Sequence, residues 1–390
     1  MKILRNNFIL IGLSEFLAKG LSWLSLAIIP FFALPETYGQ IVLYYSILVF
    51  FIPLFLFGQD RLILKDDAEQ EVVNSIVFSL VIWLSLSVLL YFLGYFLASI
   101  AGLVLALNKI YLTYLRSKDC FKKYAINRVA YSFFRFIFVV SVVYYFYNLH
   151  NYILSEIFSA LVVTIGLFII LVRSKKSIRF NFKNRVLHGI PLVLHGGALV
   201  GVALIDRFIL EKFTDFKVVG NYSFIYIFAS GLIFLYSIVS IVEEKKIYKS
   251  NDRQQLIANS KRALLLMFAI GFIGAILSVL LYVLLIKTDL ISKYGFYFYE
   301  LLVLIFAHLI LPLYLISNYI LIQSGKSKYL LWCSLFSLFI NALLNFMFIP
   351  VWGLNGAVWA TLVANICLVV LSSFLCFKVL KERKQFERYV

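Results

Sequence analysis

The stretch Ala263–Ile286 reads ALLLMFAIGFIGAILSVLLYVLLI and contains no charged residue. It is 24 residues long, and a helix needs about 20 apolar residues to cross the hydrocarbon core of a bilayer. Basic residues flank it, with Lys261 and Arg262 before it and Lys287 after it. This stretch therefore predicts a membrane-spanning helix.

Eleven other stretches share this length and composition, so the chain is expected to cross the membrane twelve times. The third and fourth spans are separated only by turn signals at Gly94 and Ser99–Gly102. A count of ten or eleven would require one segment to be a buried half-helix. The twelve predicted spans are Phe8–Phe32, Tyr38–Phe57, Asn74–Phe96, Leu97–Leu115, Val129–Tyr147, Tyr152–Val172, Ile190–Leu210, Gly220–Val242, Ala263–Ile286, Tyr299–Gln323, Tyr329–Pro350 and Leu354–Phe377.

The basic residues between the spans predict the orientation, because cytoplasmic loops are enriched in Lys and Arg. With the amino terminus in the cytosol, the inner segments hold 28 of the 36 Lys and Arg residues. The outer loops hold four, and another four lie within spans. Since one missed span would invert every later loop, this imbalance predicts a multi-pass protein with both termini in the cytoplasm.

The composition agrees with a membrane protein. Charged residues make up 14% of the chain and hydrophobic residues 63%, which argues against a soluble core of this size. The net charge of +17 lies in short inner loops, so topology explains it and no nucleic-acid partner is expected. The first span is too long for a signal peptide and lacks a cleavage site, so we expect it to remain as a helix.

The sequence carries no motif for catalysis or for a cofactor. It contains no phosphate-binding Gly-x-x-x-x-Gly-Lys-Ser/Thr loop, no His-Glu-x-x-His zinc site and no Gly-x-Ser-x-Gly motif. Its four cysteines have no metal-ligand spacing and are expected to be structural. The longest loops, Lys287–Phe298 outside and Glu243–Arg262 inside, are too short for a catalytic domain. The expected class is a carrier that works within the membrane and is not an enzyme.

The spans divide into two groups of six. Tyr38-Gly39-Gln40 and Val219-Gly220-Asn221 each follow a short acidic outer loop at an offset of 181 residues, which indicates an internal repeat unless the match is chance. The predicted fold is all-α and integral to the membrane, with about 12 transmembrane helices in two pseudo-symmetric six-helix bundles around a central cavity. The predicted domains are an N-terminal bundle at 1–172, a basic cytoplasmic linker at 173–189, a C-terminal bundle at 190–378 and a basic cytoplasmic tail at 379–390.

Six ionised side chains lie inside the predicted spans. Each costs about 2.5–3.5 kcal/mol at the centre of a span, and together they cost roughly 15–20 kcal/mol. They are therefore expected to face a cavity or one another. Basic residues outnumber acids, and such a cavity favours a phosphate or another anion. The six residues are Glu15, Lys19, Lys109, Arg135, Asp206 and Arg207.

Some of these residues also have a structural interpretation. Glu15 and Lys19 are four residues apart and would form a pair on one face of their helix. Asp206 and Arg207 point about 100° apart, so one would line the cavity while the other pairs with a neighbouring helix, or both would act as interfacial anchors near the outer end of their span.

Other polar residues near the span ends are explained by local effects. Arg116 and Arg128 lie near the inner boundary and would extend their charged ends to the membrane surface. Glu156 and Glu300 lie at the outer starts of spans six and ten, where the helix dipole favours an acidic residue, so both are expected to cap their helices.

Three segments resemble motifs of the polysaccharide and O-antigen flippases, which belong to the multidrug/oligosaccharidyl-lipid/polysaccharide exporter superfamily. Leu34-Pro35-Glu36-Thr37-Tyr38-Gly39 resembles their turn between the first two spans. Asp206–Leu210 followed by Val219–Ser223 resembles a second motif, and Ile349–Thr361 resembles a late one. The number and order of spans resemble this family over the whole chain.

The resemblance implies a transporter that moves an undecaprenyl-diphosphate-linked oligosaccharide across the bacterial inner membrane, by ion-coupled alternating access, for O-antigen (lipopolysaccharide) or other polysaccharide biosynthesis. Of the charged residues within the spans, only Asp206 and Arg207 match a motif of the family, and the roles of the others rest on their position in the membrane. Lys19, Lys109, Arg135 and Arg207 would attract the diphosphate or an acidic sugar, and Glu15 and Asp206 would balance charge or couple an ion. The expected partners are this substrate, membrane lipids, a polysaccharide polymerase and a chain-length regulator. No cofactor or metal is expected.

Two alternatives remain open. A multidrug or small-molecule exporter of the same superfamily would carry cations and is expected to have a cavity of the opposite charge. A membrane-embedded polysaccharide polymerase or ligase would reveal itself by transferring sugars in vitro.

Overall fold

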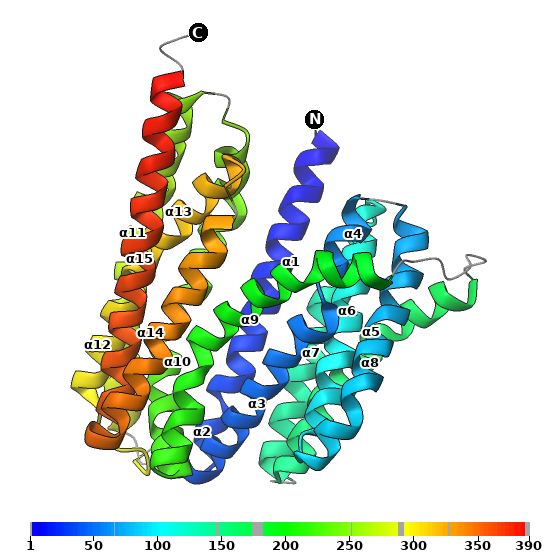
Figure 1. The fold of residues 1–390 in the computed structure, drawn as a ribbon. Helices are drawn as coiled ribbons and strands as arrows, with labels where there is room; N and C mark the ends of the chain where they lie inside the picture. Colours follow the sequence, from blue (N-terminus) through cyan, green and yellow to red (C-terminus); the bar gives the residue numbers. More distant parts are fainter. Residues whose placement is uncertain are drawn as a thin grey trace. The chain divides into compact units, whose positions relative to one another are not determined.

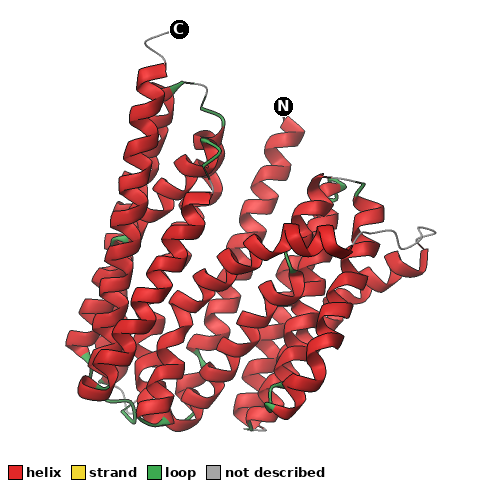
Figure 2. Cartoon of the chain, in the orientation of Figure 1, coloured by secondary structure: helices red, strands yellow, loops and turns green. Residues whose placement is uncertain are grey.

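A computed structural model describes residues 2–65, 67–145, 148–173, 182–250, 252–287, 292–326 and 328–386. All elements within these ranges are helices (Figures 1 and 2). Twelve helical segments in the described ranges are long and apolar enough to cross a membrane, which confirms the predicted all-α fold with twelve spans. The spans are Leu10–Phe32, Pro35–Leu56, Ala68–Phe92, Phe96–Ser117, Phe121–Tyr145, Leu149–Leu167, Phe182–Phe213, Phe216–Tyr248, Arg253–Ile286, Phe298–Gln323, Lys328–Trp352 and Leu354–Glu382.

The chain forms two compact units. The N-terminal unit comprises Met1–Ala33 and Gln40–Val200. Within it α1 packs on α7, and α6 packs on both α5 and α8. Its helices are α1 (Lys2–Ala27), α2 (Ile29–Phe32), most of α3 (Pro35–Leu56), α4 (Gln59–Lys65), α5 (Ala68–Phe92), α6 (Phe96–Ser117), α7 (Phe121–Tyr145), α8 (Leu149–Arg173) and the first part of α9 (Phe182–Phe213).

The C-terminal unit comprises Leu34–Gly39 and Gly201–Val390. Here α14 packs on α15, and α10 packs on α11 and α12. Besides the ends of α3 and α9, its helices are α10 (Phe216–Tyr248), α11 (Arg253–Ile286), α12 (Phe298–Leu309), α13 (Leu311–Gln323), α14 (Lys328–Trp352) and α15 (Leu354–Phe386).

The division between the units differs from the linker predicted at 173–189. It falls between Val200 and Gly201, inside α9. Residues 182–189 are already helical, whereas 174–181 lie outside the described residues. The first half of α9 belongs to the N-terminal unit because it packs on the turn between α3 and α4, where a Cβ atom at Gly189 would overlap Phe57.

Turn residues and caps explain most helix ends. Gly94 has a φ of 77° and separates α5 from α6, so this predicted turn is confirmed, whereas Ser99–Gly102 lies within α6. Span ten is divided into α12 and α13 just before Pro312, because proline cannot donate the helical hydrogen bond. Asp215 caps α10 by accepting a hydrogen bond from the backbone N–H of Val218 at 2.8 Å.

The predicted inner loop Glu243–Arg262 is mostly helical instead. α10 continues to Tyr248 and α11 starts at Arg253. The two helices pack against each other beyond the apolar stretch, where the side-chain amide of Asn259 donates to the backbone oxygen of Lys246 at 3.2 Å. Helices of 33 and 34 residues are about 50 Å long, which exceeds the roughly 30 Å hydrocarbon core.

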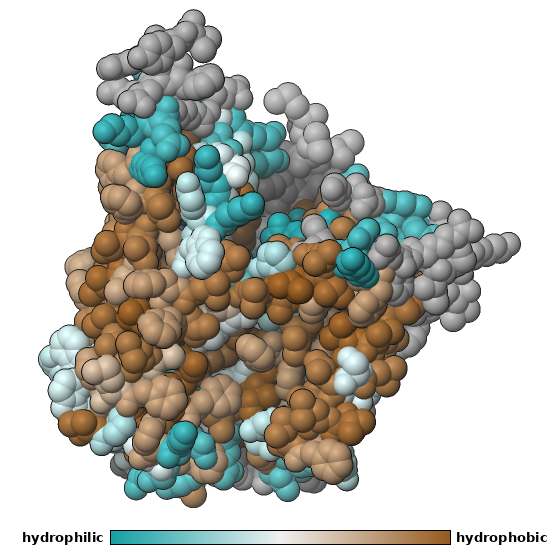
Figure 3. Space-filling model, in the orientation of Figure 1, coloured by the Kyte–Doolittle hydropathy of each residue, from teal (hydrophilic) through white to brown (hydrophobic). Residues whose placement is uncertain are grey.

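The outward faces of the helices are apolar, as lipid contact requires. On α11, Ile273, Leu277, Leu280 and Leu284 follow helical spacing, and each is more than half exposed. In Figure 3 the visible surface of the C-terminal unit is brown along most of its height and teal near its ends. An exposed apolar surface of this extent fits a bilayer and not water.

Two glycines matched by the internal repeat lie against each other. Gly39 on α3 and Gly220 on α10 both belong to the C-terminal unit. A Cβ atom at Gly39 would lie 2.1 Å from the backbone oxygen of Phe216, and one at Gly220 would lie 1.9 Å from that of Pro35. The two helix starts therefore approach so closely that only glycine fits at either position.

We expect Gly39→Ala to destabilise the protein by about 3 kcal/mol or more, because the added carbon overlaps a backbone atom that cannot rotate away. Gly197→Ala is the matched control, since its Cβ atom would make an ordinary contact of 3.8 Å with Phe50. The unfolding of both variants in detergent would be followed by heating or by SDS titration. Equal stability of the two variants would contradict the proposed close crossing.

Candidate functional site

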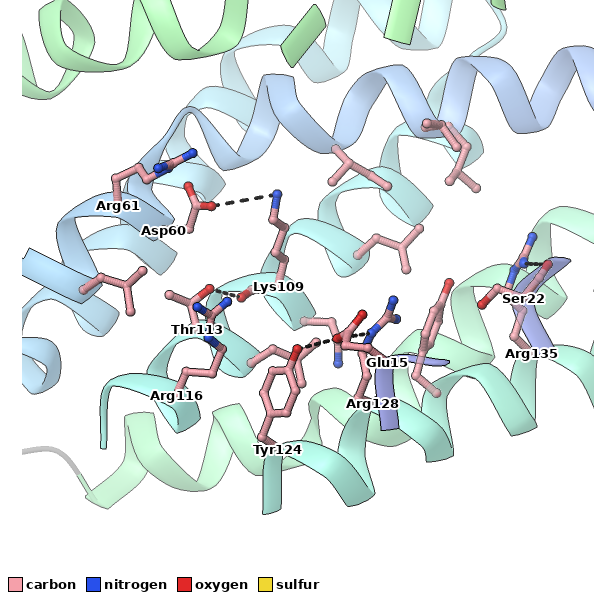
Figure 4. A pocket seen from close by; sticks show the side chains of 18 of the residues that line it. Glu15, Ser22, Asp60, Arg61, Lys109, Thr113, Arg116, Tyr124, Arg128 and Arg135 are labelled. Carbon is pink, nitrogen blue, oxygen red and sulfur yellow. Dashed lines mark hydrogen bonds and ion pairs between the residues drawn. The ribbon is translucent and has the colours of Figure 1, made fainter. Parts of the chain in front are cut away.

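The N-terminal unit contains a pocket of about 640 Å³ whose lining is rich in basic residues (Figure 4). The lining residues come from α1, α3, α4, α6 and α7, and all of them belong to this one unit. Five basic side chains and two carboxylates contribute, so the lining is net positive. They are Arg61, Lys109, Arg116, Arg128 and Arg135, with Glu15 and Asp60.

The pocket extends along α6 and α7 from the turn that joins them. Arg116 lies at the end of α6, and Lys109 lies eight residues from Ser117, which is about 12 Å along the helix. Arg135 lies 14 residues into α7, about 21 Å from its start. This length along the helix is more than half of the roughly 30 Å hydrocarbon core.

Three basic residues of the lining have few protein counter-charges. Lys109 is 53% exposed at its side chain, and its Nζ lies 3.8 Å from Asp60 Oδ2. Among the described residues, neither Arg61 nor Arg116 forms an ion pair. We call Arg61, Lys109 and Arg116 the mouth cations, and their charge is available to a bound anion.

Glu15 on α1 forms hydrogen bonds with two residues of α7. Its Oε1 accepts a hydrogen bond from Arg128 Nε at 3.0 Å and a short one from the hydroxyl of Tyr124. Lys19 interacts with Glu15 electrostatically but does not line the pocket. The interpretation of Arg128 as a surface-seeking residue was therefore wrong, because this arginine turns toward a carboxylate in the pocket.

Arg135 and Glu156 form a buried ion pair at the deep end of the pocket. Arg135 Nε donates to Glu156 Oε2 at 2.7 Å, and Nη2 donates to Oε1 at 2.7 Å. Nη1 donates to Ser25 Oγ at 2.7 Å and to the backbone oxygen of Ser22 at 2.9 Å. Both charged residues are almost fully buried.

The expectation that Glu156 caps α8 at the membrane surface was wrong. It lies seven residues after Leu149, two turns inside the helix, where it pairs with the buried guanidinium of Arg135. Because protein groups occupy most of the donors of Arg135, this residue contributes to the shape of the pocket more than to anion binding.

Asp206 and Arg207 form a second buried pair, in the C-terminal unit. Arg207 Nη1 donates to Asp206 Oδ1 at 2.9 Å, and the hydroxyl of Tyr222 donates to the other oxygen of Asp206. The guanidinium lies 4.4 Å from the ring centroid of Tyr226. Both residues are buried and Arg207 pairs with Asp206, so the alternative of two exposed interfacial anchors was wrong. Neither residue lines the pocket of the N-terminal unit.

Three of the six residues that were expected to face a cavity or one another line this pocket, namely Glu15, Lys109 and Arg135. Asp60 and Arg61, which lie on the short helix α4, were missed because they were assigned to a loop. Arg116 and Arg128 share a helix face with Lys109 and Arg135 respectively, at a spacing of seven residues in the sequence, and both line the pocket, although the membrane surface was the alternative position for them. Within the described ranges, no cluster of His, Cys, Asp and Glu could hold a metal ion.

We expect Glu156→Ala to destabilise the protein by about 3–5 kcal/mol, because it leaves the charge of Arg135 buried without a partner. The double variant Arg135→Met with Glu156→Leu is expected to recover most of this loss, since no charge then remains to be desolvated. Unfolding in detergent measures both. A double variant that is no more stable than Glu156→Ala would contradict this account of the pair.

Comparison with solved structures shows the fold of a known transporter superfamily. An inward-facing multidrug resistance MATE family transporter of the MOP superfamily aligns with a TM-score of 0.70 and 13% identity, covering 94% of this chain and 95% of that chain. An outward-facing MATE family transporter aligns with a TM-score of 0.62 and 13% identity, covering 97% and 96%.

A MOP superfamily transporter from Pyrococcus furiosus, described as having a binding pocket of reversed polarity that suggests a different function, aligns with a TM-score of 0.65 and 12% identity, covering 97% and 96%. Identities this low establish the fold alone. No curated protein matches the chain.

The family comparison is more specific. The model of a family described as "Polysaccharide biosynthesis protein" matches residues 4–242. This range is more than half of the chain and includes every residue that lines the pocket. The chain therefore belongs to this polysaccharide biosynthesis protein family, and it is a multi-pass membrane protein with the fold of the MOP superfamily transporters.

Proposed function

We propose that the protein is a flippase that moves an undecaprenyl-diphosphate-linked oligosaccharide repeat unit across the bacterial inner membrane for O-antigen or a related polysaccharide. The single observation that carries this proposal is the set of mouth cations Arg61, Lys109 and Arg116, which line a membrane pocket with little counter-charge. Family membership supports a role in polysaccharide synthesis, and the transporter fold supports translocation by alternating access.

The charge balance of the pocket supports an anionic substrate. An unpaired cation within a membrane protein is costly, and a bound anion offsets that cost. A diphosphate carries at least two negative charges and offers several acceptor oxygens, which suit both the planar fork of Arg and the ammonium group of Lys. In this proposal the mouth cations bind the diphosphate, while Arg135 fixes the deep wall.

The predicted orientation of the chain suits the proposed transport of the substrate from the cytosolic to the outer side of the membrane. If both termini are cytoplasmic, the α6–α7 turn faces the cytosol, so the mouth cations lie where a substrate made in the cytosol would enter. A polymerase and a chain-length regulator would then use the product on the opposite side. We propose that coupling to an ion involves Glu15, or the Asp206–Arg207 pair of the C-terminal unit.

The alternative is a multidrug exporter of the same superfamily. The MATE neighbours are themselves described as multidrug transporters, and their fold fits either function. Drugs exported as cations would be repelled by a lining with five basic residues and two carboxylates. The polarity of the pocket therefore favours an anion.

We expect the double variant Lys109→Ala with Arg116→Ala to bind farnesyl diphosphate about 100-fold more weakly than wild type, at about tenfold for each charged contact. Binding would be measured on purified protein in nanodiscs. Lys118→Ala is the matched control, because Lys118 lies just beyond α6, pairs with Glu69 at 3.0 Å and does not line the pocket.

The lipophilic cation tetraphenylphosphonium tests the alternative that the pocket binds cations. Tight binding of this cation, together with unchanged binding of farnesyl diphosphate in the double variant, would contradict the proposal. In cells, deleting the gene is expected to abolish surface polysaccharide and to leave drug resistance unchanged. Normal polysaccharide with increased drug sensitivity would favour the exporter.

A further inference from the structure

In the pair formed by Glu15 and Arg128, one carboxylate oxygen and the two Nη groups form no hydrogen bond with the described part of the protein. Both hydrogen bonds recorded for Glu15 end on Oε1, one from Arg128 Nε and one from Tyr124. No donor among the described residues bonds to Oε2 of Glu15, and Glu15 is one of the residues that line the pocket. A carboxylate oxygen with two lone-pair directions is therefore available to a ligand.

Arg128 also keeps donor groups that form no hydrogen bond with the described residues. Its single recorded hydrogen bond is from Nε, and its Nη1 and Nη2 groups have no recorded partner in the described part of the chain. The side chains of Arg128 and Glu15 are 21% and 18% exposed, so they are sheltered but accessible from the pocket. Donors and an acceptor thus lie side by side.

Adjacent donors and an acceptor fit hydroxyl groups better than other ligands. Each hydroxyl both donates and accepts, so neighbouring hydroxyls can satisfy Arg128 and Glu15 together. A phosphate has only acceptors at neutral pH and would be repelled by the carboxylate of Glu15. A cation would be repelled by Arg128. The group that fits is polar, uncharged and rich in hydroxyls.

The position of the pair within the pocket suits a sugar that follows a diphosphate. In Figure 4, Glu15 and Arg128 lie between Lys109 and Arg116 on one side and Arg135 on the other. The rings of Tyr45 and Tyr131 line the same pocket and offer apolar surface for the C–H faces of a sugar.

We propose that Glu15 and Arg128 form a subsite that binds the hydroxyls of an uncharged sugar, separate from the mouth cations that bind the anionic group. This inference rests on the proposed function and adds that the sugar nearest the diphosphate is recognised by hydrogen bonds from this pair. The pair would then determine which repeat unit is accepted, because a site built for hydroxyls discriminates against a ligand that leaves its groups unpaired.

Glu15→Gln tests the subsite with little change in shape. Glutamine keeps one oxygen for Arg128 and Tyr124 and replaces the free oxygen with an NH₂ donor. The probes are farnesyl diphosphate and its esters with glucose, galactose and N-acetylglucosamine. Wild type is expected to bind at least one sugar ester more tightly than farnesyl diphosphate.

In Glu15→Gln, the affinity for that ester is expected to fall about tenfold, because the free oxygen that accepts from a hydroxyl is lost. The affinity for farnesyl diphosphate is expected to stay equal or to rise, because the negative charge of the Glu15 carboxylate is removed from the pocket. Asp60→Asn is the control, since it removes a carboxylate from the same pocket near Lys109. It is expected to change the affinity for all probes in the same direction.

Two results would overturn the subsite. One is a wild type that binds every sugar ester no better than farnesyl diphosphate, and the other is a Glu15→Gln variant that changes all probes by the same factor. Failure of the wild type to bind farnesyl diphosphate at all would instead overturn the proposed function. The two hypotheses can therefore fail separately.

Discussion

The cost of placing an ionised side chain in a bilayer governs where every charge in this protein lies. The chain meets this constraint in two ways. Arg135 with Glu156 and Arg207 with Asp206 are neutralised by neighbouring protein groups and are buried. Lys109 and Arg116 are not closely paired and instead face a pocket, where water or a substrate supplies the missing interactions.

This division separates structural charges from binding charges. A fully bonded pair gains no further stability from a ligand, and breaking it is costly, so Arg135 and Glu156 are expected to hold α7 and α8 in place. A loosely paired cation loses little when it exchanges water for a phosphate oxygen. The buried pair of Arg135 and Glu156 thus forms the deep wall of the pocket, and the loosely paired mouth cations can bind an anion. The pair of Glu15 and Arg128, which keeps hydrogen-bonding groups available to a ligand, lies between them.

Much of the fold could be predicted because span length and charge bias are properties of single segments. The residue with which each buried charge pairs could not be predicted from the sequence. The sequence shows that Arg135 is deep in the membrane, but it does not show that Glu156, 21 residues later on the next helix, turns inward to meet it. Asp60 and Arg61 were missed because α4 is too short to give a helical pattern. The polar ends of α10 and α11 were assigned to a loop because the sequence does not show which groups they contact, such as the backbone oxygen of Lys246 for Asn259 and that of Leu380 for Arg253.

The central claim is that the mouth cations bind the anionic part of a lipid-linked saccharide. The most direct measurement is an experimental structure of the protein in nanodiscs with a polyprenyl-diphosphate-linked sugar. We predict density for the two phosphates within hydrogen-bond distance of Lys109 and Arg116, with the sugar directed toward Glu15. Phosphate density at another site, or a pocket filled by a cationic ligand in its place, would contradict the account.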